Sequence, residues 1–221
     1  MAAPMAIVQT TVSATVAPAP VAPLALEMAD LTAMVRKCDY ITKCTSNKKK
    51  DPSSLSYLVD TKLSQSDCIK LGIGIEKYLI EIIQAYTTLD NIKEKNKKGK
   101  KETDHLFMDP TTKTIYYAEL KANLNLDTEK SKSTYNKCLD IVSLLKETYP
   151  GYTIQWCLLG IRYTSRDTIP KIIRGRYSPI DANLYGINDY FTALNIPFQF
   201  TEESYRQLVN VIATAMFSED P

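Results

Sequence analysis

The sequence predicts an α/β protein in which a mixed β-sheet carries α-helices on both sides. Two long segments, 66–86 and 128–149, have apolar residues at helical spacing. Between them, two β-prone runs flank a polar turn that contains a proline, which is typical of a hairpin. A nearly continuous apolar run at 153–163 is typical of a central strand buried on both faces. This order of elements favours a sheet between helical layers.

Composition limits the class of protein. The chain has 221 residues, of which 44% are hydrophobic and 24% charged, with 27 Lys+Arg against 25 Asp+Glu. Apolar residues are plentiful and glycine is scarce, which excludes a wholly disordered chain, a collagen-like fibre and a coiled coil. No uninterrupted apolar stretch has the length of a membrane span, so we expect no membrane partner. The net charge of +2 does not by itself indicate nucleic acid.

Cysteine usage and the first residues predict the compartment. The 5 cysteines have no CxxC spacing, and their odd number cannot form a complete set of disulfides within one chain. The first ten residues contain no Lys or Arg, so they lack the positively charged region of a secretory signal. We therefore expect an intracellular, cytoplasmic protein with reduced cysteines.

Residues 1–27 are expected to form a flexible Ala/Pro-rich tail, and 28–221 are expected to form one domain. The segment before Glu27 carries no charge, and the prolines of 17–23 oppose a helix. The alternative is an extra edge strand over 6–16.

The remaining elements follow from apolar spacing and composition. Helices are expected at 30–44, 66–86, 128–149, 185–194 and 202–217, and 93–101, with six lysines, is expected to be a solvated loop. The stripe predicted to face inward on the second helix is Ile69, Ile73, Leu79, Ile80 and Ile83. On the third helix the residues predicted to face inward are Tyr135, Cys138, Leu139, Val142 and Leu145.

The hairpin places charged residues next to one another. If 110–113 form its loop, the residue numbers of opposed positions sum to 223, which places Asp104 directly across from Glu119. Lys121 lies two residues beyond Glu119 and shares its face. Asp109 would lie at the turn, roughly 17 Å from Glu119 at strand rise, so we exclude it as a ligand.

Two carboxylates and an ammonium in this arrangement suit metal-assisted hydrolysis. Carboxylates are preferred Mg²⁺ ligands, and a metal-bound water loses its proton more readily. Lys121 could orient that water or stabilise developing charge. The alternative is that Asp104 is a loop acid and that Glu119 and Lys121 lie on an exposed edge strand.

These residues resemble the PD-(D/E)xK nuclease superfamily. Asp104, the hairpin and the run YAELK (117–121) match its pattern of Asp and (D/E)xK on adjacent strands, although Thr103 stands where a proline often precedes the Asp. The continuation ELKANLNLDTEKS (119–131) resembles type II restriction endonucleases, and the resemblance spans about 69–163.

That resemblance implies a restriction-endonuclease-like fold and Mg²⁺-dependent cleavage of double-stranded DNA at a short specific site by a homodimer. Asp104 and Glu119 would hold the metal, and Lys121 would position the attacking water. Repair or recombination nucleases of the same superfamily are the nearer alternative. A non-catalytic DNA-binding module with the same fold is the more distant one.

Glu76 would be a third metal ligand by the same resemblance, because members often supply an acid from the helix before the hairpin. It lies within the apolar stripe, where a carboxylate is costly unless it is paired or binds metal. The alternative is a glutamate at the border of the stripe, paired with a lysine.

Several polar residues are candidate DNA contacts. They are Lys97, Lys98, Lys100 and Lys101 of the lysine loop, Asn123 and Lys130 after the hairpin, and Arg174 and Arg176 in an expected later loop. The lysine loop could equally be a solvated linker, and Asp127 or Thr128 could simply cap the next helix. His105, the single histidine, alternates away from Asp104, and we expect it to pack or to contact backbone.

Overall fold

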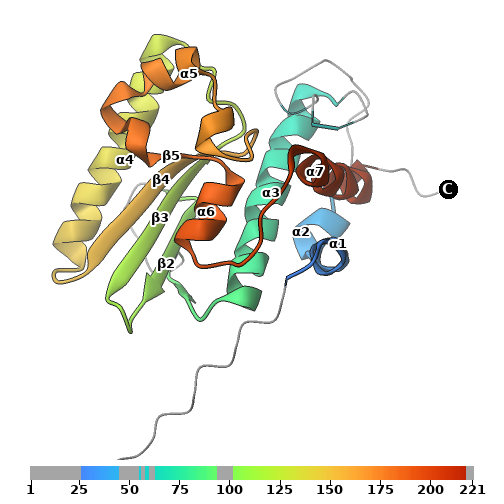
Figure 1. Ribbon diagram of the computed structural model, residues 1–221, viewed down its shortest axis with the longest axis horizontal. Helices are drawn as coiled ribbons and strands as arrows, with labels where there is room; N and C mark the ends of the chain where they lie inside the picture. The colour runs from blue at the N-terminus through green and yellow to red at the C-terminus, as the bar shows by residue number, and fades with distance from the viewer. Residues whose placement is uncertain (1–25, 45–54, 56–57, 60–62, 94–101, 218–221) are drawn as a thin grey trace, which may run out of the picture.

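The computed structural model describes residues 26–44, 55, 58–59, 63–93 and 102–217. Its centre is a sheet of five strands in the order β1-β2-β3-β4-β5 (Figure 1). The strands are β1 (Asp90–Asn91), β2 (His105–Asp109), β3 (Thr114–Lys121), β4 (Thr153–Gly160) and β5 (Leu184–Tyr185). Strands β1 to β3 pair antiparallel, whereas β3, β4 and β5 pair parallel. The predicted mixed α/β sheet is therefore confirmed.

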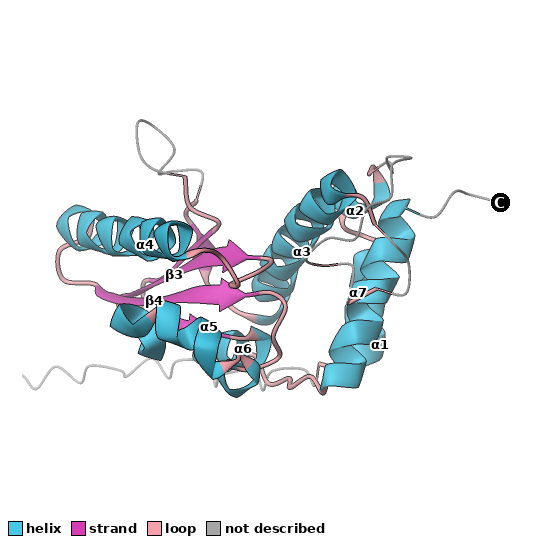
Figure 2. Ribbon diagram, turned by 90° about the horizontal axis from the view of Figure 1, so that it is seen from above, coloured by secondary structure: helices cyan, strands magenta, loops and turns pink. Residues whose placement is uncertain are grey.

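Helices cover both faces of this sheet (Figure 2). The α-helices are α1 (Met28–Val35), α2 (Asp39–Thr42), α3 (Gln65–Tyr86), α4 (Thr128–Thr148), α5 (Lys171–Arg176), α6 (Ile187–Ala193) and α7 (Glu202–Phe217). Two 3-10 helices, η2 (Arg166–Thr168) and η3 (Ser178–Asn183), flank α5. Helix α4 packs on one face, α3 and α6 pack on the other, and α1, α2 and α7 pack against α3. None of the described helices is long and apolar enough to cross a membrane.

The hairpin of β2 and β3 has the predicted register. Its pairs run from His105 with Ala118 to Asp109 with Thr114, so each pair sums to 223. The loop is 110–113, in which Lys113 adopts a φ of 51°. Asp109 orders this loop by accepting hydrogen bonds from the Thr111 and Thr112 amides at 2.8 and 3.2 Å. The assignment of Asp109 to the turn is thus confirmed.

Alternation along β3 divides the core into two clusters. Ala118 and Leu120 belong to the cluster with α3 and α6, whereas Ile115 and Tyr117 belong to the cluster with α4. Glu119 and Lys121 share the parity of Tyr117, so they lie on the α4 face. The register therefore decides which helix covers the charged pair.

Tertiary packing overrides parts of the predicted apolar stripes. Leu79, Ile80 and Ile83 are buried as predicted, whereas Ile69 and Ile73 are 59% and 36% exposed. Similarly, Leu139 is 40% exposed. Apolar residues occur around more of each helix than its buried face, so spacing identified most of the buried residues but also included a few exposed ones.

Other elements differ from the sequence prediction at their ends. The expected helix over 30–44 is divided into α1 and α2, and β4 is buried only from Cys157 to Gly160. The folded part begins before the predicted boundary, since Leu26 is buried and the Glu27 amide donates to Asp30 Oδ2 at 3.1 Å. The tail and edge-strand predictions for 1–25 lie outside the described residues. All five cysteines are free thiols, as expected.

His105 connects α3 and α6, the two helices on the face of the sheet opposite α4. It is fully buried, with Nε2 3.0 Å from the Glu76 carbonyl oxygen and Nδ1 2.9 Å from the Tyr190 hydroxyl. A carbonyl only accepts, so Nε2 carries the proton and Nδ1 accepts from Tyr190. Burial lowers the pKa of His105 from 6.5 to about 3. The expectation that His105 turns away from Asp104 and contacts backbone is confirmed.

This pairing predicts a pH-dependent stability. The pKa of His105 is lower in the folded protein than in the unfolded chain. Its contribution to the free energy of unfolding is therefore complete above pH 6.5 and is lost as the pH falls towards about 3. We expect the free energy of unfolding to lose up to ~1.4 kcal/mol per pH unit from this residue in that window. Urea titrations of wild type and His105→Gln at several pH values measure it. A difference between the two proteins that does not change with pH would contradict the buried neutral histidine.

Candidate functional site

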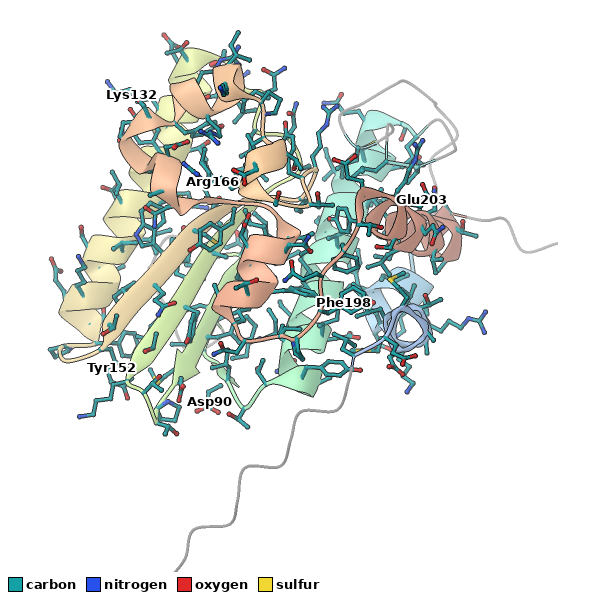
Figure 3. All side chains as sticks on the ribbon, in the orientation of Figure 1. Asp90, Lys132, Tyr152, Arg166, Phe198 and Glu203 are labelled. Carbon is teal, nitrogen blue, oxygen red and sulfur yellow. The ribbon has the colours of Figure 1, made fainter. Side chains whose placement is uncertain are left out.

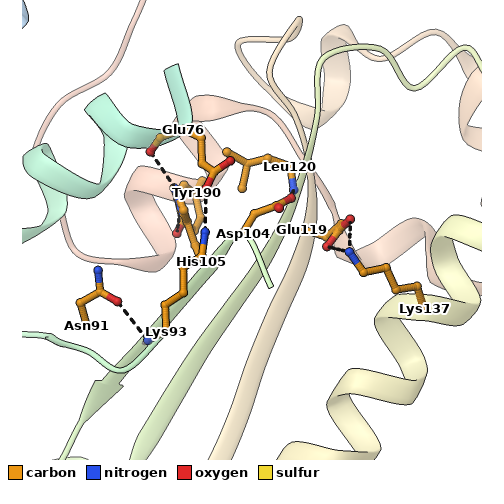
Figure 4. Close-up of polar contacts among 9 residues, drawn as sticks. All are labelled: Glu76, Asn91, Lys93, Asp104, His105, Glu119, Leu120, Lys137 and Tyr190. Atoms are coloured by element: carbon orange, nitrogen blue, oxygen red, sulfur yellow. Dashed lines mark hydrogen bonds and ion pairs between the residues drawn. The ribbon is translucent and has the colours of Figure 1, made fainter. Parts of the chain in front are cut away.

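The site lies where the chain enters β2 and β3 ends. Asp104 immediately precedes β2, and its Oδ2 accepts a hydrogen bond from the Leu120 amide at 2.7 Å (Figure 4). Leu120 stands between Glu119 and Lys121, so this bond fixes the Asp104 carboxylate beside both. The structure thus brings Asp104, Glu119 and Lys121 together as the hairpin predicted.

Glu119 is a buried carboxylate held by two lysines. Its side chain is 0% exposed, and Lys121 Nζ lies 2.7 Å from its Oε1. Lys137 of α4 contacts both carboxylate oxygens at 2.8 Å. The Tyr117 hydroxyl donates to Oε2 at 3.4 Å. The alternative of an exposed edge strand is therefore wrong for Glu119, because β4 pairs with β3 and α4 covers its face.

Burial and neighbouring charges shift the pKa values of this cluster. Burial, and then the Glu119 carboxylate, raise the pKa of Asp104 to about 6, against the opposing Leu120 hydrogen bond. Burial alone would lower the pKa of Lys121, but the Glu119 and Asp104 carboxylates outweigh it and raise the pKa. Asp104 is thus a partly buried acid whose charge is incompletely compensated by the protein.

Glu76 lies near the site but has its own partner. Its Oε1 is 2.8 Å from Lys93 Nζ, and both side chains are largely buried. Its charge contributes to the raised pKa of Asp104, so the two carboxylates are neighbours. The pairing corresponds to the alternative of a border glutamate paired with a lysine. Lys93 begins the expected solvated loop, yet it is only 9% exposed.

The donor set suits a hard cation with few protein ligands. The described residues contain no cluster of three or more His, Cys, Asp or Glu side chains arranged to hold a metal. Asp104, just before β2, and Glu119 in β3 could supply oxygen ligands, and a nearby cation would offset the burial that raises the pKa of Asp104. Mg²⁺ commonly uses one or two carboxylates and keeps several waters. These two residues therefore fit Mg²⁺ if Glu119 exchanges an ammonium for the ion.

The candidate DNA contacts that the structure describes are bonded to other residues of the protein. Lys97, Lys98, Lys100 and Lys101 lie outside the described residues. Asn123 Oδ1 accepts from the Asn125 amide at 2.8 Å, and Lys130 Nζ lies 3.1 Å from Asp127 Oδ2 on the exposed start of α4. Asp127 is the N-cap of α4, accepting from the Lys130 amide at 2.8 Å, as the capping interpretation predicted.

The two arginines are held by the protein itself. Arg174 and Arg176 belong to α5, so the expected loop is wrong; this helix has 6 residues, too few for a clear apolar period. Arg176 Nη1 donates to Asn125 Oδ1 at 2.8 Å, and Arg174 Nε lies 3.2 Å from Asp181 Oδ1. Both side chains therefore fasten α5 to neighbouring segments.

Sequence reasoning missed Lys137. It lies four residues before Ile141, which α4 buries, so the two share a helix face. A lysine at the edge of an apolar stripe needs an acidic partner, and that was the available signal. The partner, Glu119, is 18 residues away in sequence, and only the crossover of α4 onto β3 brings them together.

Comparison with protein-family models gives no match, and neither curated proteins nor solved structures yield one. The assignment of function therefore depends on the residues of this site.

The geometry separates the roles of the two hairpin aspartates. If Asp104 and Glu119 hold Mg²⁺, Asp104→Asn should weaken its binding at least about tenfold, because a charged ligand beside Glu119 is lost. Asp109→Asn should leave Mg²⁺ affinity nearly unchanged, because Asp109 ends β2 at the turn and its carboxylate accepts hydrogen bonds from the turn amides. Calorimetric titration of each folded variant with Mg²⁺ tests this. The reverse order of affinities would contradict the assignment.

Proposed function

We propose that this protein is a Mg²⁺-dependent DNA endonuclease of the type II restriction class, with a restriction-endonuclease-like fold. The observation that carries the proposal is the convergence of Asp104, Glu119 and Lys121 at adjoining ends of β2 and β3. Asp104 contacts the Leu120 amide at 2.7 Å and Lys121 contacts Glu119 at 2.7 Å. These contacts support the proposal, because the PD-(D/E)xK pattern has its Asp and its (D/E)xK residues on adjacent strands.

Asp104 and Glu119 would hold Mg²⁺ in this proposal. When bound, the ion would make an attached water more acidic and offset charge on the phosphate. Lys121 is tethered to Glu119 and partly exposed, so its ammonium can orient the attacking water or stabilise the charge that develops on the phosphate. Glu76 is a neighbouring acid whose pairing with Lys93 keeps its carboxylate in place.

The substrate in this proposal is double-stranded DNA, cut at a short specific site by a homodimer in the cytoplasm. Symmetric dimers suit palindromic sites, because each copy meets an equivalent half-site. Basic residues outside the catalytic set, including the lysine loop, would contribute contacts to phosphates.

Two other functions use the same fold. A repair or recombination nuclease would keep the same three residues but act on flaps, mismatches or ends. A non-catalytic DNA-binding module is favoured by one observation, namely that lysines occupy both oxygens of Glu119. In that case Glu119 and its two lysine partners would only stabilise the fold.

Plasmid digestion distinguishes these functions. A plasmid of known sequence is incubated with the protein and Mg²⁺ or EDTA, and the ends are mapped by run-off sequencing. Discrete, Mg²⁺-dependent ends support restriction. Cleavage only at flaps, mismatches or ends supports a repair role, and binding without cleavage supports the module.

Within the proposed nuclease, Glu119→Gln and Lys121→Met should each lower the cleavage rate at least about 100-fold, because each removes charge at the reacting centre. Lys121→Met should fold nearly as wild type because Lys121 is partly exposed, whereas Glu119→Gln should be less stable because two ammonium groups lose their charged partner, so cleavage and DNA binding are compared for the folded proteins. Lys146→Met, exposed near the end of α4, is the control for loss of a lysine charge. Near wild-type cleavage by either site variant would contradict the assignment.

A further inference from the structure

Lys137 forms an ion pair with Glu119, the carboxylate that a metal ion would need as a ligand. Its Nζ lies 2.8 Å from each oxygen of Glu119, and Lys121 Nζ also contacts Oε1. Glu119 is 0% exposed, so water does not share these contacts. Two ammonium groups therefore hold the carboxylate that, with Asp104, forms the candidate metal site.

The two lysines are not equivalent. Lys121 contacts a single oxygen and comes from the same strand, two residues away. Lys137 bridges both oxygens and comes from α4, across the layer between helix and sheet (Figure 4). A cation that coordinates Glu119 must compete mainly with Lys137, because Lys137 contacts both carboxylate oxygens and like charges repel strongly at contact distance in a partly buried site.

The Lys137 side chain has room to move away from Glu119. Its side chain is 34% exposed and borders a shallow depression of about 460 Å³ lined by residues of α4. Asp140 lines the same depression three residues further along the helix, where residues three apart are neighbours. An ammonium leaving Glu119 can therefore move towards solvent by side-chain rotation, without displacement of α4.

Resting on the proposed function, we propose that Lys137 is a positioning residue that occupies the metal's place on Glu119 and is displaced when Mg²⁺ binds. It keeps the buried carboxylate neutralised and correctly oriented in the metal-free protein. By competing with the ion, it also sets the Mg²⁺ concentration at which the site fills. A purely structural ion pair would stabilise the fold without opposing the metal.

Metal binding to the DNA-free protein tests this inference. We expect Lys137→Met to bind Mn²⁺, used as a spectroscopic probe for Mg²⁺, about tenfold more tightly than wild type, because a competing charged hydrogen bond is lost. Electron paramagnetic resonance of unbound Mn²⁺ gives the affinity. Lys137→Gln, which retains a donor without charge, should shift the affinity in the same direction and provides a second variant if Met impairs folding.

Lys132→Met is the matched control. Lys132 is an exposed residue of α4 at the rim of the same depression (Figure 3), so its loss changes the net charge equally. Its Mn²⁺ affinity should stay within about twofold of wild type, because exposed charges are well screened. Equal tightening in Lys132→Met and Lys137→Met would show a general charge effect and overturn the inference.

The outcomes separate this inference from the proposed function. If wild type cleaves DNA with Mg²⁺ but loss of Lys137 leaves Mn²⁺ affinity unchanged or weaker, the competitor role is wrong and the nuclease assignment stands. If neither protein binds Mn²⁺ and wild type does not cleave, both are wrong. In cleavage assays, the Mg²⁺ concentration for half-maximal rate should fall about tenfold in Lys137→Met if the inference holds.

Discussion

The buried carboxylate of Glu119 is the constraint on which the arrangement of the site depends. An ionised group removed from water is costly unless it is paired and hydrogen-bonded. Lys121 supplies one partner from β3 itself, whereas Lys137 must come from α4. The crossover helix is therefore held over the carboxyl end of β3 by charge as well as by the apolar cluster beneath it.

The opposite face of the sheet is organised by a neutral contact. His105, next to Asp104, joins the Glu76 carbonyl of α3 to the Tyr190 hydroxyl of α6. Successive residues at the start of β2 thus face different environments, because side chains alternate along a strand. One residue anchors the helical layer, and its neighbour contributes to the charged cluster.

The two carboxylates of the site, Glu119 and Asp104, are not equally neutralised by their neighbours. Glu119 has two ammonium partners, whereas Asp104 is held by a backbone amide and retains a raised pKa. Raised pKa values next to a charged cluster are typical of functional sites, although structural ion pairs also produce them. In the proposed nuclease, a divalent ion between these carboxylates would correct the imbalance and displace Lys137.

Local sequence alone determined the hairpin, the long helices α3, α4 and α7, and the proximity of Asp104, Glu119 and Lys121. These depend on turn chemistry and on periods of two or 3.6 residues, which act over short stretches of chain. Only the tertiary structure decided that α3 leaves Ile69 exposed, that Lys93 pairs with Glu76, and that Lys137 bridges Glu119. Those outcomes depend on which surfaces meet when distant segments pack, and burial determines which charges need partners.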